Sequence, residues 1–414
     1  MDTKTLRCGL LGRKLGHSYS PAIHERLADY SYRLFEVEPE DLGAFLQEGA
    51  FDGLNVTIPY KKDVIHYCAE LSDTARAIGA VNTLVRRADG TLWGDNTDAY
   101  GFSMLVQSSG ADVAGKKALV FGSGGASATA QYVLRRLGAR EVVVISRHGE
   151  DNYENLDRHA DAQIAVNTTP VGMYPNTGVS PVDLHRLPRL EAALDVVYNP
   201  ARTEFLLQAE ARGLRRANGL LMLAAQAKKS CEDFTGEPVD DAKIFSITKA
   251  LEAQMHNVIL IGMPGSGKTT IGTLVAKRLG RTFVDADSAL EREAGMPIPE
   301  IFRREGEAGF RRRETAVLAE LGRQSGLVLA TGGGSVTREE NYPLLHQNGE
   351  IFCLQRALER LPSVGRPVSQ ALGAQTIYAQ RKPLYARFAD AMIDNNGTPE
   401  AAAAQILEVL GCSC

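Results

Sequence analysis

The 414-residue sequence has little excess charge and no long apolar run. Its formal net charge is -4, so it lacks the basic balance that is typical of proteins binding nucleic acid or acidic membranes. No apolar run approaches the roughly 20 residues that span a bilayer. Residues 1–5 lack the apolar core and cleavage site of a signal peptide. We therefore expect a cytoplasmic protein that binds small molecules, without nucleic acid, a membrane or an obligatory protein partner.

Cysteine and histidine are also sparse. The six cysteines lie far apart except Cys412 and Cys414, which fits a reducing compartment better than a disulfide framework. The eight histidines show no HExxH or paired spacing, so we expect no protein-held zinc. The terminal Cys-Ser-Cys has neither a polybasic run nor a histidine or cysteine partner nearby, and we interpret it as an incidental terminus rather than a lipid or metal site.

Two phosphate-loop signatures organise the chain, whose length predicts about two to three domains. The first is Gly122-Ser-Gly-Gly-Ala-Ser127 and the second is Gly262-Met-Pro-Gly-Ser-Gly-Lys-Thr269. Each follows an apolar, strand-like run and precedes a helix-like stretch, so each opens an α/β unit. Since one doubly wound sheet seldom needs both loops, we infer two catalytic units in tandem. A helix expected over 240–254 places their boundary near Met255, with a linker of only a few residues.

The first loop has the physics of a dinucleotide site. Gly122 permits the tight turn, Gly124 lets the backbone approach a pyrophosphate, and the following helix N-terminus favours anionic oxygens. We expect the cofactor to contact Gly122, Gly124, Gly125 and Ala126.

Arg147 bears on the choice of cofactor. It follows a strand expected over 141–145, where NAD-binding folds usually carry an acidic residue. An arginine can pair with a 2′-phosphate, which favours NADP. The alternative is a solvated cation at a strand end, and the nearby Glu150 and Asp151 keep that alternative open.

Polar residues cluster at turns before the first loop. They lie in the segments 16–21, 53–61, 79–83 and 94–98, a composition suited to binding a polyol acid. Ser18 and Ser20 can donate to a carboxylate. Lys61 supplies an ammonium and Asp98 a carboxylate that orients it. Such a pair suits proton transfer to an oxygen that becomes an alkoxide when a carbonyl accepts hydride.

These segments, with 167–173, 195–200, 219–223 and Gln226, resemble shikimate dehydrogenase over about residues 6–254. The resemblance implies that Ser18 and Ser20 meet the substrate carboxylate and that Lys61 and Asp98 form the catalytic pair. It assigns the remaining site residues to substrate hydroxyls (Thr57, Asn82, Asp98, Gln226), to the substrate's vicinity (Tyr198) and to the nicotinamide (Gly219). The stretch 148–163 is shorter than is usual in that family, and we expect this shortening to affect the affinity for the cofactor but not the chemistry.

The second loop has the form of a nucleoside-triphosphate site. Its backbone N–H groups wrap the β-phosphate, Lys268 neutralises phosphate charge, and Thr269 ligates Mg²⁺. The nucleotide contacts expected are Gly262, Gly265, Gly267, Lys268, Thr269 and Thr270. Strand alternation over 283–287 should turn Asp285 and Asp287 to the same side, facing the loop, one to serve Mg²⁺ and the other the attacking hydroxyl.

The second unit resembles shikimate kinase over about residues 256–411. The resemblance rests on the second loop together with the segments 283–287, 306–311, 332–334, 366–367 and 381–385. The resemblance implies shikimate binding by Asp287, Arg311, Gly333 and Arg381, and Mg²⁺ binding by Asp285 with Thr269. It places Arg366 in a lid over the phosphates and gives Lys268, Asp287 and Arg366 to catalysis. We interpret Arg312 and Arg313 as a solvated helix face.

The expected fold is α/β throughout. It comprises a substrate-binding lobe (1–100, with helices of 222–254 packing back on it), a Rossmann NADP-binding domain (101–221) and a P-loop, NMP-kinase-like parallel-sheet domain (256–414). The resemblances imply NADPH-dependent reduction of 3-dehydroshikimate, followed by MgATP-dependent phosphorylation of shikimate at the hydroxyl just formed.

Two alternatives remain at this stage. One is an NAD-using quinate/shikimate dehydrogenase, which an acidic residue at position 146 would have supported. The other is that one unit has become a non-catalytic binding module, and the intact Lys61, Asp98, Lys268 and Asp287 argue against it.

Overall fold

The computed structural model describes residues 6–16, 18–49, 51–361 and 374–412. The chain divides into two units. The first comprises Met1–Gly172, Val179–Tyr198 and Phe205–Ala250, and the second Met173–Gly178, Asn199–Glu204 and Leu251–Cys414. The division falls within helix α8 (Ala242–Met255), and the next strand begins at Asn257. No helix among the described residues is long and apolar enough to cross a membrane.

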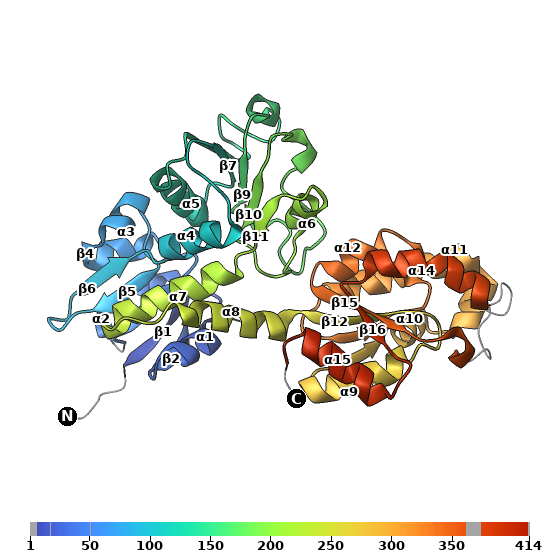
Figure 1. The fold of residues 1–414 in the computed structure, drawn as a ribbon. Helices are drawn as coiled ribbons and strands as arrows, with labels where there is room; N and C mark the ends of the chain where they lie inside the picture. The colour runs from blue at the N-terminus through green and yellow to red at the C-terminus, as the bar shows by residue number, and fades with distance from the viewer. Residues whose placement is uncertain (1–5, 17, 50, 362–373, 413–414) are drawn as a thin grey trace. The chain divides into compact units, whose positions relative to one another are not determined.

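The first sheet is a mixed sheet of the N-terminal part (Figure 1). Its strand order is β2 (Ser31–Glu36), β1 (Arg7–Gly12), β3 (Gly53–Val56), β5 (Thr83–Arg86), β6 (Leu92–Asp95), β4 (Cys68–Leu71). Only β5 runs antiparallel to the others among the paired strands of this sheet. The carboxyl ends of β3 and β6 and the start of β5 therefore lie at one edge, where Thr57, Asn82 and Asp98 follow or precede them.

The second sheet is parallel throughout and also belongs to the first unit. Its strand order is β11 (Arg215–Ala217), β10 (Ala192–Asp195), β9 (Ile164–Asn167), β7 (Lys117–Phe121), β8 (Glu141–Ile145). Leu119 and Phe121 pack on one face with Phe205, whereas Ala118 and Val120 pack on the other. Because both faces are covered, the central strands β7, β9 and β10 are buried along their whole length, without alternation.

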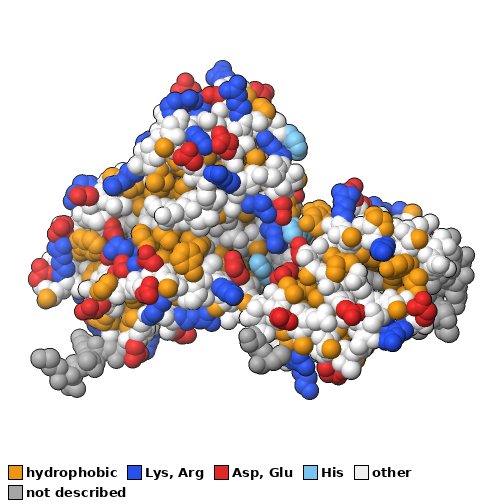
Figure 2. Space-filling model, viewed as in Figure 1, with side chains coloured by type: hydrophobic (Ala, Val, Ile, Leu, Met, Phe, Trp, Pro, Cys, Tyr) orange, Lys and Arg blue, Asp and Glu red, His pale blue; other side chains and the backbone are white. Residues whose placement is uncertain are grey.

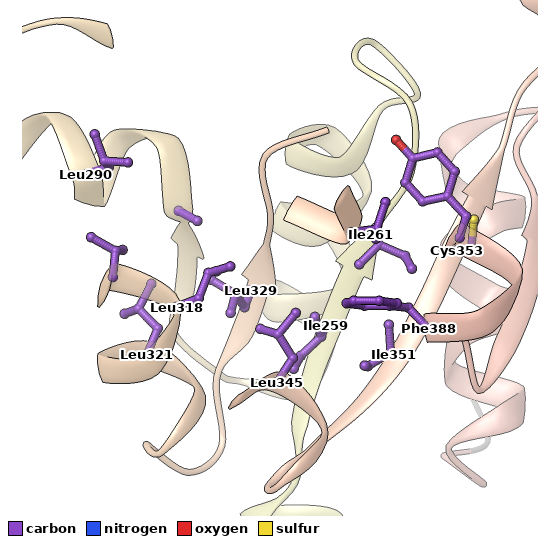
Figure 3. Packing of buried hydrophobic residues seen from close by; sticks show 14 of the residues in the cluster. Ile259, Ile261, Leu290, Leu318, Leu321, Leu329, Leu345, Ile351, Cys353 and Phe388 are labelled. Carbon is purple, nitrogen blue, oxygen red and sulfur yellow. The ribbon is translucent and has the colours of Figure 1, made fainter. Parts of the chain in front are cut away.

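The third sheet forms the core of the second unit and is also parallel. Its strand order is β13 (Phe283–Asp285), β14 (Val328–Ala330), β12 (Asn257–Ile261), β15 (Gly349–Gln355), β16 (Ala391–Asp394). Ile259 aligns with Leu329 on one neighbour and Ile351 on the other. These three side chains pack with Leu345 and Phe388 in one buried cluster (Figure 3).

Helices cover the sheets within each unit (Figure 1). In the first unit they are α1 (Ser20–Leu27), α2 (Leu42–Glu48), α3 (Asp73–Ile78), α4 (Asp98–Ser109), α5 (Gly125–Arg136), α6 (Glu204–Ala211), α7 (Leu220–Thr235) and most of α8. In the second unit they are α9 (Lys268–Leu279), α10 (Ala286–Ala294), α11 (Ile298–Gly322), α12 (Asn341–His346), α14 (Ala374–Phe388) and α15 (Pro399–Val409). Helix α11 is broken at Gly306, whose backbone is not helical.

The visible surface carries acidic and basic side chains interspersed, without a large patch of one sign (Figure 2). This agrees with the small net charge of -4. An evenly mixed surface provides no long-range field that would concentrate a polyanion.

Helices α4 and α7 pack closely against each other (Figure 1). Gly101, buried in α4, makes this approach possible, because a Cβ added there would lie 2.6 Å from the carbonyl oxygen of Met222 and 3.1 Å from the Cβ of Gln226. Both contacts are on α7, and the Met222 oxygen is backbone that cannot rotate away. The absence of one side chain thus sets the spacing between the helices that carry Asp98 and Gln226.

We expect Gly101→Ala to destabilise the first unit. The gain in helix propensity, about 1 kcal/mol, is outweighed by overpacking of about 1–3 kcal/mol. Urea denaturation followed by circular dichroism measures the difference. Gly43→Ala in α2 is the matched control, since the three atoms nearest its Cβ all belong to the Tyr67 side chain, which can move; the hydroxyl, at 3.0 Å, is the closest. Equal stability of the two variants would contradict this account.

Candidate active sites

The first candidate site is a cavity of about 280 Å³ in the first unit. The structure brings to its wall every substrate-side residue expected from the sequence: Ser18, Ser20, Thr57, Lys61, Asn82, Asp98, Tyr198, Gly219 and Gln226. They come from three sources: the edge of the first sheet, the ends of β10 and β11, and helix α7. The wall also contains Asn55, Val196, Met222 and Leu223, which lie in segments noted from the sequence but received no individual role there. Met222 and Leu223 precede Gln226 by about one helical turn, a spacing that could have identified them.

Lys61 and Asp98 form an ion pair inside this cavity. The Lys61 ammonium donates to Asp98 Oδ2 over 2.6 Å, and the two side chains are 24% and 14% exposed. Asn82 donates from Nδ2 to the other carboxylate oxygen, Oδ1, over 2.9 Å. With both oxygens engaged, the carboxylate has a set orientation, and the ammonium remains at the cavity wall where it can reach a bound oxygen.

Tyr198 contacts the segment that carries the two serines. Tyr19, between Ser18 and Ser20, meets the Tyr198 ring edge-on at a centroid distance of 6.1 Å. Burial raises the pKa of Tyr198, and Tyr19 raises it further. Tyr198 is therefore a neutral phenol that can donate a hydrogen bond, and its ring helps to fix the serine loop.

The glycine-rich loop after β7 matches the shape of a phosphate cradle. Gly122 has φ of 108°, a region that favours glycine, and a Cβ there would lie 2.9 Å from the Thr168 hydroxyl. A Cβ at Gly124 or Gly125 would meet no heavy atom within 4 Å, so this part of the loop faces open space at the start of α5. The N–H groups of that helix end, beginning with Gly125 and Ala126, suit a pyrophosphate. The residues present therefore fit a dinucleotide.

Asp151, one of the two acidic residues near Arg147, is engaged by other groups of the protein. Asp151 Oδ1 pairs with His159 Nε2 at 2.8 Å, and its carbonyl oxygen accepts from the backbone N–H of Ser146. The Arg147 guanidinium acts on Tyr153, whose pKa is raised by burial and lowered by that charge. The Asp151 carboxylate is thus committed to a histidine, and Arg147 lies after β8 beside a tyrosine.

The second candidate site is a cavity of about 640 Å³ in the second unit. Its wall holds most of the residues expected there: Gly265, Gly267, Lys268, Thr269, Thr270, Asp285, Asp287, Arg311, Gly333 and Arg381. Gly262 directly follows the preceding strand and does not line the cavity. Arg366 lies outside the described residues. Lys268 donates from its ammonium to the carbonyls of Gly262 and Met263, at 2.9 and 3.1 Å, within its own loop.

Asp285 and Asp287 both face this cavity, but the expected strand alternation is not the reason. Strand β13 ends at Asp285, and Asp287 belongs to the first turn of α10. Asp285 caps that helix, because its Oδ1 accepts from the backbone N–H groups of Asp287 and Ser288. Its Oδ2 accepts from the Thr269 hydroxyl at 2.9 Å. The cap, not the pleat, brings the two carboxylates together.

These oxygen donors fit Mg²⁺. Thr269 and Asp285 lie within hydrogen-bonding distance at the mouth of the phosphate loop. Among the described residues there is no group of three or more histidine, cysteine or acidic side chains placed to hold a metal ion. A protein contribution of one carboxylate and one hydroxyl is what Mg²⁺ requires when phosphate and water oxygens complete its shell.

Burial raises the pKa of Asp287 to about 6, with the negative charges of Asp285 and Glu314 adding to the effect. Lys268 and Arg311 oppose it. A carboxyl with this pKa is ionised at neutral pH but is more basic than usual. It is therefore suited to accept a hydrogen bond or proton from a hydroxyl.

Glu314 is a site residue that the sequence reasoning missed. It is 2% exposed and accepts from Arg311 Nη1 at 2.7 Å. Burial raises the pKa of Glu314, and Arg311 lowers it. The i, i+3 spacing from Arg311 on α11 is the signal that could have identified the pair. By contrast, Arg312 is exposed and Arg313 pairs with Glu305 at 2.9 Å, so both lie away from the cavity wall.

The loop Gly332–Gly334 lies close to the side chains of Arg311, Arg381 and Tyr385. Arg381 Nη1 and the Tyr385 hydroxyl both donate to the Gly333 carbonyl, at 2.9 and 2.5 Å. A Cβ at Gly334 would collide with the Arg311 guanidinium. The glycines thus let two arginines converge on one wall, which suits an anionic acceptor.

In comparisons with known proteins, the N-terminal and C-terminal parts of the chain match two different families. Residues 264–411 match the family model described as shikimate kinase, and residues 10–84 match the shikimate dehydrogenase substrate binding domain. A shikimate dehydrogenase (NADP(+)) of Clostridium perfringens strain SM101 is 36% identical over 267 residues, which cover 59% of this chain and 98% of that protein.

Solved structures match the same part of the chain. A chorismate mutase/shikimate 5-dehydrogenase fusion protein from Clostridium acetobutylicum is 35% identical with a TM-score of 0.57, covering 60% of this chain and 98% of that one. The shikimate 5-dehydrogenase from Thermus thermophilus, in complex with NADP(H) and shikimate, is 33% identical with a TM-score of 0.55, covering 59% and 99%. The chain therefore belongs to the shikimate dehydrogenase family, and it carries a shikimate kinase domain after the dehydrogenase part.

Proposed function

We propose that this chain reduces 3-dehydroshikimate to shikimate with NADPH and then phosphorylates shikimate with MgATP. The observation that carries the proposal is the 2.6 Å Lys61–Asp98 pair within a polar cavity, on a chain whose second cavity surrounds a phosphate loop. The widely spaced cysteines support the cytoplasm as the proposed compartment.

In the dehydrogenase site, bound NADPH supplies the hydride. Ser18 and Ser20 hold the substrate carboxylate by donating from their hydroxyls. The Lys61 ammonium donates a proton to the carbonyl oxygen as that oxygen gains charge, and Asp98 keeps the ammonium aimed at it. Thr57, Asn82 and Gln226 orient the ring hydroxyls, Tyr198 lies near the substrate, and Gly219 would lie near the nicotinamide.

In the kinase site, bound MgATP supplies the phosphoryl group. Lys268 and the loop N–H groups hold the phosphate oxygens, and Thr269 with Asp285 holds the metal ion. Arg311 and Arg381 pair with the shikimate carboxylate beside the Gly333 carbonyl. Asp287 accepts a hydrogen bond from the attacking hydroxyl and takes its proton.

The two activities should separate cleanly by mutation. We expect Lys61→Ala to lower dehydrogenase kcat by roughly a hundredfold, the loss typical of general acid–base catalysis, without changing phosphorylation of added shikimate. We expect Lys268→Ala to abolish phosphorylation and to leave NADPH oxidation nearly intact. Spectrophotometric assays of each purified full chain provide both measurements. Normal turnover by Lys61→Ala and by Asp98→Asn would refute the proposed pair.

Cofactor choice should depend on Arg147. We expect NADP to be preferred over NAD by at least tenfold in kcat/KM, which corresponds to about 1.4 kcal/mol. Removing the guanidinium in Arg147→Ala should erode that preference, since no other charge change is made, and the kinase activity of the same chain serves as the control. Equal kcat/KM values for the two cofactors in the unmutated chain would exclude this role.

Phosphorylation should weaken in mild acid. Because the Asp287 pKa is about 6, lowering the pH through that value protonates the group that must accept the hydroxyl hydrogen. The kcat/KM for MgATP at subsaturating shikimate, measured between pH 5 and 8, reports on the site before Mg²⁺ offsets the Asp285 charge, and it is expected to fall below about pH 6. Asp287→Asn should be weakly active and lack this limb. An acid limb near pH 4, the range of an ordinary carboxyl, would be the contrary result.

A further inference from the structure

Ser230 stands at the centre of a buried group of polar side chains behind the dehydrogenase cavity. It lies on α7, one turn after Gln226, and is fully buried. Its hydroxyl is 2.7 Å from Asn55 Nδ2, 2.9 Å from Thr83 Oγ1 and 2.9 Å from Thr97 Oγ1. It is also 2.9 Å from the Gln226 carbonyl oxygen. None of the sequence motifs includes this residue, and it does not line the cavity itself.

The same group continues to the ion pair. The backbone N–H of Thr97 donates to Asn82 Oδ1 over 2.7 Å, which places the amide oxygen on that side. Asn82 Nδ2 then points to Thr97 Oγ1 at 3.0 Å and to Asp98 Oδ1 at 2.9 Å. Thr83 Oγ1 lies 3.1 Å from Asn82 Oδ1 and donates to it. The orientation of Asn82, and through it that of Asp98, is thus set by the two threonines.

Ser230 links the two threonines to the backbone of α7. It gives its single hydroxyl proton to the Gln226 carbonyl. The Thr83 and Thr97 hydroxyls each lie 2.9 Å from its oxygen and also reach Asn82 Oδ1, at 3.1 and 3.2 Å. Asn55 also donates to Ser230, and Tyr32 holds that amide by donating to Asn55 Oδ1 over 2.8 Å. Since Asn55, Asn82, Thr83 and Thr97 are all at least nine-tenths buried, no bulk water can replace a lost partner.

We propose that Ser230 is a positioning residue for the dehydrogenase. It acts through Thr83 and Thr97 on Asn82, which holds the Asp98 carboxylate against Lys61. Removal of the hydroxyl takes the nearer acceptor from an Asn55 N–H and leaves a gap beside the Thr83 and Thr97 hydroxyls, both of which contact Asn82 Oδ1. The inference rests on the proposed catalytic role of the Lys61–Asp98 pair.

The test compares Ser230→Ala and Ser230→Cys in the full chain. We expect dehydrogenase kcat to fall about tenfold in both, because a misplaced Asp98 slows proton transfer, while KM for NADPH stays within twofold. Cysteine restores the volume of the side chain but hydrogen-bonds weakly. Urea denaturation followed by circular dichroism reports whether the first unit of each variant is folded, since kinase activity reports only on the second unit. Ser103→Ala is the matched control, since its hydroxyl likewise donates to a carbonyl one turn back, that of Ala99 at 2.9 Å, outside this group.

A double-mutant cycle with Asn82→Ala then tests whether Ser230 acts on Asp98 through Asn82. If Ser230 acts through Asn82, adding Ser230→Ala to Asn82→Ala changes kcat by less than twofold. A further tenfold loss in that background would overturn the inference, and so would normal kcat in Ser230→Ala or restored kcat in Ser230→Cys. Absence of dehydrogenase activity in the unmutated chain would instead refute the proposed function.

Discussion

Parallel strands bring their carboxyl ends to one edge of a sheet, and both candidate sites depend on this constraint. In the first unit, Thr57 follows β3 and Asp98 follows β6, while Tyr198 follows β10 of the second sheet. In the second unit, the phosphate loop follows β12 and Asp285 ends β13. Residues far apart in sequence thus meet without any long excursion of the chain. The loops can vary in chemistry because the strands beneath them are held by buried apolar packing.

Charge is the second constraint. Burying an unpaired carboxylate or ammonium costs several kcal/mol, so each charge taken into a cavity wall needs a partner. Lys61 has Asp98 in one unit, and Arg311 has Glu314 in the other. Such pairs contribute little net stability, since desolvation offsets most of the attraction. Their value lies in orientation: a paired charge is held at the wall in one direction, where it can act on a bound anion or a reacting oxygen.

Much of the site could be predicted from the sequence because its residues sit in short segments with unusual composition. Ser18, Lys61 and Gln226 belong to such segments, and the structure places them on one wall. Glu314 and Ser230 were not predicted, because each is an ordinary polar residue on a helix. The importance of Ser230 arises from neighbours on other elements, and that of Glu314 from Arg311, one turn away on the same helix. The positions of Asp285 and Asp287 relative to the loop were expected for the wrong reason, since a helix cap replaces the strand pleat between them.

The α/β class, the two phosphate loops and the polar segments that surround them can be read from the amino-acid sequence. They depend on local rules: apolar runs of strand length, glycines before a helix, and residue types suited to a reaction. Which side chains are buried, which atoms face each other and how far apart they lie depend on how the elements pack. The pKa of Asp287, the commitment of Asp151 to His159 and the four neighbours of Ser230 all result from contacts that form only when separate elements pack together. Local sequence patterns cannot predict such contacts, because the desolvation of a side chain and the geometry of its hydrogen bonds are set only when separate elements pack together.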